Sequence, residues 1–216
     1  MQYHAANTDS LMTITNRPDL VFERGEGSWL TDHQGKRYLD FIQGWAVNCL
    51  GHCPPEIRDA LVKQASTLLN PSPAFYNGPM VELAGLLTAN SVFDRVFFAN
   101  TGAEANEGAI KLARKWGYET KGVEERHANI IVMANNFHGR TTTVISFSND
   151  ETARRNFGPF TPGFLPVPFG DAAALEAASS GARRVACRAS RMEWRSWDAL
   201  LVEASDMRLA GRRCRS

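Results

Sequence analysis

Residues 98–107 read FANTGAEANE, and the segments on either side give this stretch a structural context. The apolar run Val96-Phe97-Phe98 leads into it and predicts a buried strand. Downstream, residues recur at spacings of four, three and four, which places them on one face of a helix: Ala105, Ala109, Leu112 and Trp116. The stretch is therefore predicted to connect the end of a buried strand to the start of a helix.

The start of this helix has the properties of an anion-binding site. Thr101 stands at the N-cap position and Glu104 follows three residues later, the capping-box arrangement. Gly102 removes the side chain at the turn, so a ligand can approach the backbone closely. The first N–H groups of a helix lack intrahelical partners, and the helix dipole favours an anion there. From the residues alone, a phosphate cradle and a capped helix without a ligand remain equally open. Neither a G-x-x-x-x-G-K-[ST] run nor a G-x-G-x-x-G run is present.

Two sequence motifs extend the interpretation. Residues 100–107, followed by AIKLAR at 109–114, resemble the cofactor-phosphate loop of the class III aminotransferases, which use pyridoxal 5′-phosphate (PLP). A second matching stretch, NFHGRT at residues 136–141, lies downstream at the family's distance. The resemblance runs from about the N-terminus to about Gly181. It implies an α/β fold, fold-type I PLP-transferase (aspartate aminotransferase-like), incomplete here: a small N-terminal α+β segment and the first part of the large-domain sheet.

The resemblance also implies roles for individual residues. The backbone N–H groups of Gly102 and Ala103 would bind the PLP phosphate, and Phe137 would stack on the pyridine ring. Arg140 would hold the substrate α-carboxylate, since a guanidinium offers two parallel hydrogen bonds to a carboxylate. The alternative for Phe137 is a core phenylalanine at a strand end without a ligand. The alternative for Arg140 is a surface arginine. His138 is expected to be structural.

Two parts of the family's machinery are not matched. These are the aspartate that pairs with the pyridine nitrogen and the lysine that forms the Schiff base with PLP. The chain has five lysines, none matching the family's Schiff-base lysine: Lys36, Lys63, Lys111, Lys115 and Lys121. Lys111 and Lys115 fall at least two helical turns beyond the cradle. No catalytic residue is therefore assigned.

The implied reaction transfers an amino group from N2-acetylornithine, or a related ω-amine, to 2-oxoglutarate in arginine biosynthesis. Another ω-aminotransferase or an aminomutase of the same family is the first alternative. The second is a non-catalytic remnant that at most binds PLP or a partner subunit. In the intact family the partner would be a second copy of the chain, as a homodimer.

Composition narrows the class of protein. The 216 residues are 44% hydrophobic and 22% charged with a net charge of +1, as in a globular protein, and give no argument for nucleic acid or a membrane surface. No apolar run approaches the ~18 residues of a membrane span, and no secretory signal opens the chain, so we expect a cytoplasmic protein. Cys49 and Cys53 lack the further ligands that zinc requires, so no metal site is expected.

Three regions follow one another along the chain. Residues 1–70 are expected to form an N-terminal segment, with an antiparallel meander at 17–43 and a helix after Pro54-Pro55. The buried stripe of that helix is predicted to be Ile57, Leu61, Ala65 and Leu68. By resemblance, residues 44–52 line the substrate entrance; from the residues alone, Trp45 is equally a core or interface aromatic.

Residues 71–182 are expected to form a partial PLP-binding large domain. It would contain a helix at 78–90, a strand at 130–133 covered on both faces, a long irregular loop at 157–169 and a helix at 171–178 capped by Asp171. Residues 144–147 fit a short strand or a helix. Because such a sheet needs its neighbouring strands, we expect a marginally stable fragment with exposed apolar faces.

Residues 183–216 form an Arg-rich tail that does not match the family. It has nine arginines and no lysine, whereas residues 1–182 have ten arginines and five lysines. Our hypothesis is a reading-frame change near Gly181; the alternative is a genuine basic C-terminal helix, with 197–209 as its candidate range. Translating the downstream DNA in the other frames tests the hypothesis.

Overall fold

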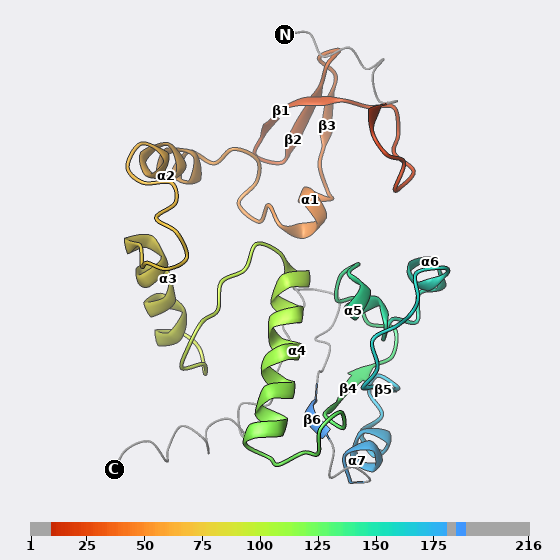
Figure 1. Ribbon diagram of the computed structural model, residues 1–216. Helices are drawn as coiled ribbons and strands as arrows, with labels where there is room; N and C mark the ends of the chain where they lie inside the picture. Colours follow the sequence, from red (N-terminus) through yellow and green to blue (C-terminus); the bar gives the residue numbers. More distant parts are fainter. Residues whose placement is uncertain (1–9, 181–184, 189–216) are drawn as a thin grey trace. The chain divides into compact units, whose positions relative to one another are not determined.

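The computed structural model describes residues 10–180 and 185–188. The chain divides into two compact units, Met1–Asn77 and Gly78–Ser216 (Figure 1). None of the described helices has the length and apolar character needed to cross a membrane.

Unit 1 contains the expected antiparallel meander. Strands β1 (Phe22–Glu26), β2 (Trp29–Asp32) and β3 (Arg37–Leu39) pair in that order, with Glu26 opposite Trp29 and Trp29 opposite Leu39. The turn after β2 is organised by the Asp32 carboxylate, which accepts hydrogen bonds from the N–H groups of Gln34 and Lys36 and from the Tyr38 hydroxyl, each at 2.9 Å. Burial raises the pKa of Asp32, but the hydrogen bonds from Lys36, Tyr38 and Gln34 outweigh it, so the pKa is lowered.

A left-handed turn follows the meander. It is α1 (Gln43–Ala46), and its residues have φ between 48° and 65°, a region that L-residues other than glycine seldom adopt. The Asp40 carboxylate anchors its start by accepting the N–H groups of Ile42 at 2.8 Å and Gln43 at 3.0 Å. The second oxygen of that carboxylate lies 2.7 Å from His52 Nε2. The pKa of Asp40 is lowered, most strongly by the hydrogen bond from the Gln43 N–H and next by the hydrogen bond from His52.

The predicted buried stripe of the next helix is wrong. Helix α2 (Pro55–Ala65) has no buried residue, and Ile57, Leu61 and Leu68 are all exposed. Helix α3 (Gly78–Ala89), which opens unit 2, likewise buries none of its residues. The apolar spacing is that of an amphipathic helix, but in the described part of the chain nothing covers the apolar side of either helix.

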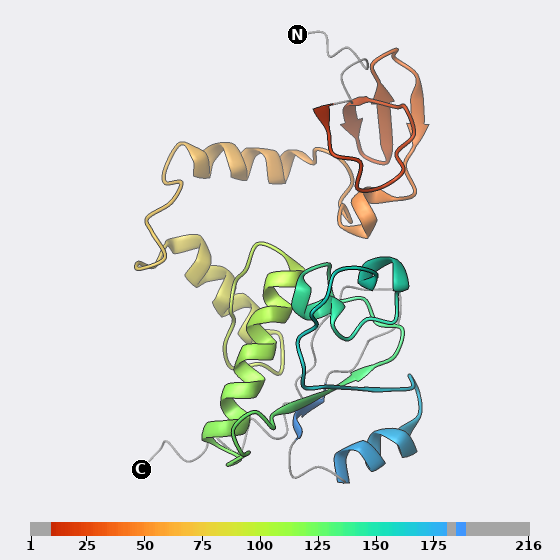
Figure 2. The ribbon, with the colours of Figure 1, turned by 45° about the vertical axis from the view of Figure 1, so that its right-hand side comes forward.

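Unit 2 is built on a parallel three-stranded sheet. Strand β4 (Asn129–Met133) lies between β5 (Phe164–Val167) and β6 (Val185–Arg188). Helix α4 (Gly102–Glu119) covers one face and α7 (Ala172–Ser180) the other (Figures 1 and 2). Alternate β4 residues fill the two interfaces: Ile130 and Val132 pack with Ile110 of α4, whereas Ile131 and Met133 pack towards α7. The prediction that this strand is covered on both faces is confirmed.

Two expectations around α4 are wrong. Residues 96–98 form no strand and pair with no strand of the described chain, and Phe97 is 75% exposed. The buried face of α4 keeps the spacing of four, three and four but is shifted by one residue from the predicted face: Asn106, Ile110, Ala113 and Gly117. Periodicity gives the spacing, whereas the position of the sheet selects which stripe is buried.

The remaining elements refine the sequence prediction. Residues 144–147 begin within a short helix, α5 (Thr142–Ile145), and α6 (Glu151–Arg154) is a further short helix. Strand β5 lies inside the segment expected to be an irregular loop. Helix α7 is capped as predicted, since Asp171 Oδ1 accepts the Ala174 N–H at 2.9 Å.

Strand β6 lies in the segment expected to be a non-matching tail, so the sheet continues past residue 182. The proposed helix at 197–209, Cys214 and the tail tryptophans lie outside the described residues.

Candidate functional site

The N-terminus of α4 has the predicted capping box. Thr101 Oγ1 accepts the Glu104 N–H at 3.1 Å, and Glu104 Oε2 accepts the N–H groups of Thr101 at 3.0 Å and Asn100 at 2.8 Å. Among the described residues, no acceptor faces the N–H groups of Gly102 and Ala103. The cap therefore leaves the same two donors that the sequence assigned to a phosphate.

The space beside these donors is open. Apart from its chain neighbours and its own helix backbone, a Cβ atom built on Gly102 would meet no atom of the described residues within 4 Å. A ligand can therefore reach the backbone at this point without displacing protein, which is the geometry that helix-terminus anion sites use. The residues present fit a phosphate monoester.

The second motif meets the first through one backbone contact. Gly139, in the segment after β4, has φ +122°, and a Cβ on it would lie 2.9 Å from Ala103 Cβ. Only glycine combines this dihedral angle with so close an approach. The structure thus brings Gly139 against the first turn of α4, although the two motifs are far apart in sequence.

Phe137 and Arg140 lie together on this loop. The Arg140 guanidinium carbon is 4.8 Å from the centroid of the Phe137 ring, within the range of a cation–π contact. Phe137 is 50% exposed and the Arg140 side chain is 58% exposed. Both side chains are therefore accessible to solvent, and neither belongs to the apolar core.

Asp150 is a site neighbour that the sequence did not reveal. Its Oδ2 lies 3.3 Å from Arg140 Nη1, and its Oδ1 caps α6 by accepting the Thr152 N–H at 2.9 Å. An ion pair this exposed contributes little stability. It orients the guanidinium, and the helix-capping role of Asp150 was the available sequence signal.

The interior of the loop is organised by a buried polar pair. His138 Nδ1 lies 3.0 Å from Asn136 Oδ1, and the Asn136 amide donates to the carbonyls of Met133 at 2.6 Å and Phe147 at 3.2 Å. His138 also packs edge-on against Phe147. These contacts give His138 a structural setting beneath the loop.

Two further residues of α4 contact the loop directly, and sequence reasoning missed both. The Asn106 amide donates to the His138 carbonyl at 2.7 Å, and the Thr141 hydroxyl donates to Glu107 Oε1 at 2.8 Å. The sequence signal for Asn106 is that a polar residue shares the helical stripe of Ile110, Ala113 and Gly117, which is the stripe that the structure buries.

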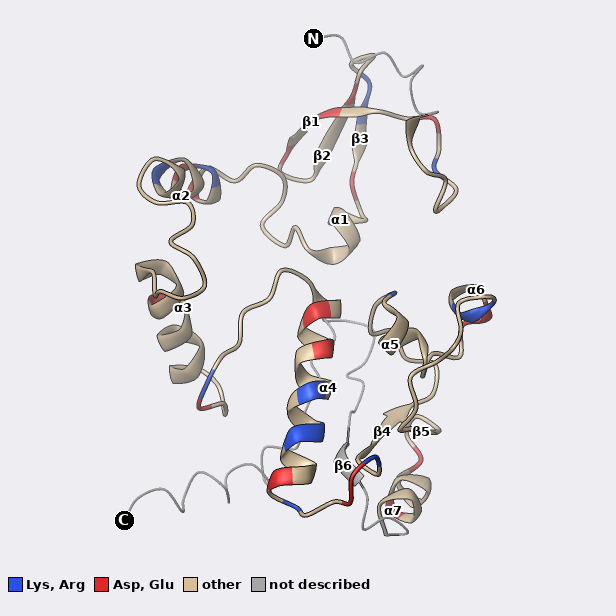
Figure 3. Cartoon of the chain, viewed as in Figure 1, with Lys and Arg blue, Asp and Glu red and all other residues tan. Residues whose placement is uncertain are grey.

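The lysines of α4 are placed away from the cradle. Charged residues occur along the length of the helix, with acidic residues near both ends and basic residues between (Figure 3). Lys115 is 3.5 Å from Glu119 at the C-terminal end, and Lys121 lies over Trp116 just beyond it. These contacts place Lys115 and Lys121 at or just beyond the end of α4 opposite to Gly102.

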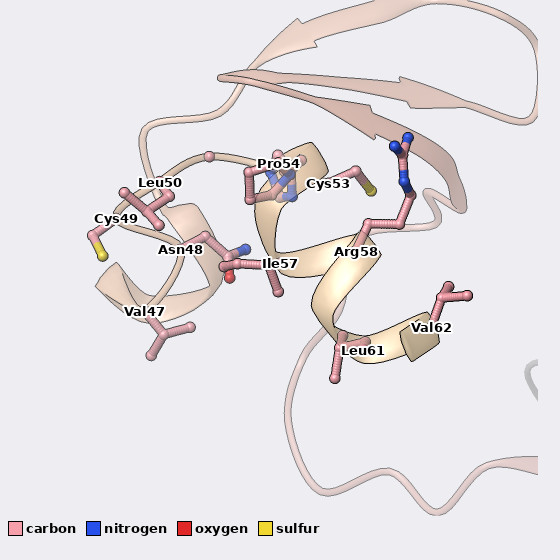
Figure 4. A pocket seen from close by; sticks show the side chains of 12 residues that line it. Val47, Asn48, Cys49, Leu50, Cys53, Pro54, Ile57, Arg58, Leu61 and Val62 are labelled. Atoms are coloured by element: carbon pink, nitrogen blue, oxygen red, sulfur yellow. The ribbon is translucent and has the colours of Figure 1, made fainter. Parts of the chain in front are cut away.

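Unit 1 has a hollow of its own, which the sequence did not predict. It has a volume of about 620 Å³ and lies between residues 47–54 and the first turns of α2 (Figure 4). Cys49 and Cys53 line it but point in different directions. The described residues contain no cluster of three or more side chains suited to a metal ion.

This chain is similar to known proteins over most of its length. The family model "Aminotransferase class-III" matches residues 13–205, which extends past residue 181, where the motif-level resemblance ended. Acetylornithine aminotransferase of Ralstonia nicotianae is 59% identical over 169 residues, covering 78% of this chain and 42% of that protein. Ornithine aminotransferase of Bordetella pertussis is 49% identical over 160 residues, covering 74% of this chain and 39% of that protein.

Solved structures give the same result. Ornithine aminotransferase from Toxoplasma gondii matches with a TM-score of 0.82 at 36% identity, covering 86% of this chain and 44% of that one. Acetylornithine aminotransferase from Elizabethkingia anophelis matches with a TM-score of 0.70 at 45% identity, covering 84% and 44%. The chain spans less than half the length of these relatives. Its fold is thus part of the fold-type I architecture, and the chain belongs to the class III aminotransferases, a family of PLP-dependent enzymes.

Proposed function

We propose that this chain supplies the phosphate-, ring- and carboxylate-binding part of an aminotransferase. The whole protein would move the amino group of N2-acetylornithine, or of a related ω-amine such as ornithine, to 2-oxoglutarate in arginine biosynthesis. The observation that supports the proposal is the approach of Gly139 to Ala103, which joins the loop that carries Phe137 and Arg140 to the first turn of α4.

Each binding group has a distinct task. The N–H groups of Gly102 and Ala103 would hold the PLP phosphate, where the helix dipole adds a favourable field. Phe137 would lie against the pyridine ring. When bound, PLP withdraws electrons from the substrate's reacting carbon.

Arg140 would bind the carboxylate of the amino-acid substrate. Its planar guanidinium forms two parallel hydrogen bonds to a carboxylate, a geometry that lysine lacks. The contacts with Phe137 and Asp150 restrict the side chain before the substrate arrives, which reduces the entropy lost on binding. A substrate carboxylate would share or replace the contact with Asp150.

The position of the lysines favours a second candidate function for the chain by itself. Lys115 and Lys121 lie at the end of α4 opposite to Gly102, and no lysine matches the family's Schiff-base lysine. Alone, the chain would bind PLP without turning it over, as a non-catalytic remnant or as a partner for an intact subunit. A related ω-aminotransferase or aminomutase activity remains the alternative for the whole protein. We further propose a cytoplasmic location and a homodimer for the complete enzyme.

Reduction by borohydride separates these candidates. The chain is incubated with PLP, treated with borohydride, unfolded and weighed by mass spectrometry. Cofactor fixed to a single lysine would support an enzyme, whereas complete release after a demonstrated binding step would support the remnant.

A proline substitution tests the phosphate site. Gly102 is the first residue of α4, where proline is tolerated, and Thr101 before it is already extended at φ −136° and ψ 158°. Gly102→Pro therefore removes one donor and leaves the helix intact. We expect affinity for 4-deoxypyridoxine 5′-phosphate, a PLP analogue without the aldehyde, to fall about tenfold to a hundredfold.

Ala172→Pro is the matched control for this test. It removes the equivalent N–H from the start of α7, away from the loop, and should leave binding unchanged. Equal affinities of Gly102→Pro and the unsubstituted chain would refute the proposed site.

A further inference from the structure

Three residues on one side of α4 contact successive positions of the loop that carries Phe137 and Arg140. Ala103, Asn106 and Glu107 are spaced by three and four residues and so share a helical face. Ala103 meets Gly139, Asn106 binds the His138 carbonyl and Glu107 accepts from Thr141. We propose that Asn106 and Glu107 are positioning residues that fix Phe137 and Arg140 relative to the phosphate-binding end of α4, an inference that rests on the proposed function.

The contact made by Asn106 is buried. The residue is 2% exposed, and its amide donates at 2.7 Å to a carbonyl 32 residues away in sequence. Burying an amide is unfavourable unless it is hydrogen-bonded, and leaving the opposite carbonyl unpaired has a similar cost. Both costs are avoided where the His138 carbonyl faces Asn106, so this hydrogen bond favours one seating of the loop on the helix.

Glu107 holds the other side of the same segment. The hydroxyl of Thr141, the residue after Arg140, donates to its carboxylate at 2.8 Å. The two hydrogen bonds bracket Gly139 and Arg140, while the backbone of Gly139 packs against Ala103 between them. Phe137 and Arg140 contact neither Asn106 nor Glu107 through these bonds, so the helix acts on them through the loop backbone.

This arrangement predicts which ligands depend on the two residues. A bare phosphate needs only the amides of Gly102 and Ala103. A phosphate ester that carries an aromatic ring needs those amides and a Phe137 ring placed at a fixed distance from them. Asn106 and Glu107 should therefore control the preference for the ring-bearing ester over bare phosphate, and not the phosphate affinity itself.

The test measures the affinities of 4-deoxypyridoxine 5′-phosphate and inorganic phosphate in the full chain and in three variants. Asn106→Leu removes the buried donor, and Glu107→Leu removes the acceptor. Glu107→Gln keeps a side-chain oxygen for Thr141 and is the conservative rescue. In both leucine variants the preference for the ring-bearing ligand should fall about threefold to tenfold, the value of an aromatic contact. Inorganic phosphate should bind as before, and Glu107→Gln should resemble the unsubstituted chain.

The possible outcomes separate this inference from the proposed function. If the unsubstituted chain binds neither ligand, the proposed function fails and the inference fails with it. If it binds both and the leucine variants keep the ring preference, only the inference is overturned. A parallel loss of both ligands would reduce the two residues to a structural role. Glu107→Leu decides the result should Asn106→Leu not fold.

Discussion

The contacts inside unit 2 differ in kind from the contacts inside unit 1. In unit 2, β4 is buried on both faces, and apolar side chains from α4, α5 and α7 pack against it. In unit 1, the only buried residue among those described is a carboxylate, Asp32, and no apolar side chain is buried. Its turns are organised by hydrogen bonds to Asp32 and Asp40. A unit stabilised by apolar burial responds to loss of volume, whereas one organised by carboxylates responds to pH.

The largest expected effect is in the sheet of unit 2. Ile131 is 0% exposed, and Ile131→Ala should lower the free energy of unfolding by about 2–5 kcal/mol through lost burial and a residual cavity. Urea unfolding followed by amide hydrogen exchange in β4 measures this. The counterpart in unit 1, Leu30→Ala, truncates a half-buried side chain and should cost about 1 kcal/mol. Equal costs would show an apolar core in the meander and would break the comparison.

A smaller effect is expected at the contact between loop and helix. Gly139→Ala introduces a side chain at φ +122° and 2.9 Å from Ala103 Cβ, and should cost about 1–3 kcal/mol. Gly102→Ala is the control, since its Cβ meets nothing within 4 Å, and should change stability by less than about 0.5 kcal/mol. Both are measured by thermal unfolding. Similar values for the two variants would mean that the loop is not tightly seated on α4.

Acid should act on unit 1 before unit 2. The folded-state pKa values of Asp32 and Asp40 are lowered, so their contribution is complete above the ordinary aspartate pKa and is lost as pH falls through the folded values. Hydrogen exchange corrected for its intrinsic pH dependence should show β1–β3 losing protection at a higher pH than β4. Asp32→Asn and Asp40→Asn should lower stability at neutral pH and flatten this dependence. Loss of protection at the same pH in both units would contradict the assignment of acid sensitivity in unit 1 to Asp32 and Asp40.

The smallest effect is expected at the exposed segment before α4. Phe97 is largely exposed, so Phe97→Ser should change the free energy of unfolding by less than about 0.5 kcal/mol. The same substitution removes exposed apolar surface and should reduce aggregation, which light scattering measures. A cost near that of Ile131→Ala would show that this run is buried like β4.

Helix caps could be predicted from the sequence, whereas the face that each helix buries could not. The capping box at Thr101 and Glu104 follows from spacing alone, and so does the helix that Asp171 caps. The buried face of α4 was predicted one residue away, because its sequence carries two stripes of suitable spacing and only the sheet selects between them. The run at 96–98 reads like β4 but has no neighbouring strand among the described residues.

The candidate site divides in the same way. Gly102, Ala103, Phe137 and Arg140 were found through motif resemblance, which reports the residues that would touch a ligand. Asn106, Glu107 and Asp150 act on the loop through hydrogen bonds and an ion pair that depend on the tertiary fold. No local spacing relates position 106 to a carbonyl at position 138.

The contact between Ala103 and Gly139 also limits how the two motifs can evolve. Position 139 is already glycine, so no smaller residue there can make room for a larger side chain at position 103. Enlargement of Ala103 to valine or to a bulkier residue must be absorbed by displacement of the main chain at Gly139. The two positions should therefore tolerate substitution asymmetrically, with position 103 confined to alanine, glycine or serine for as long as the loop is needed where it is.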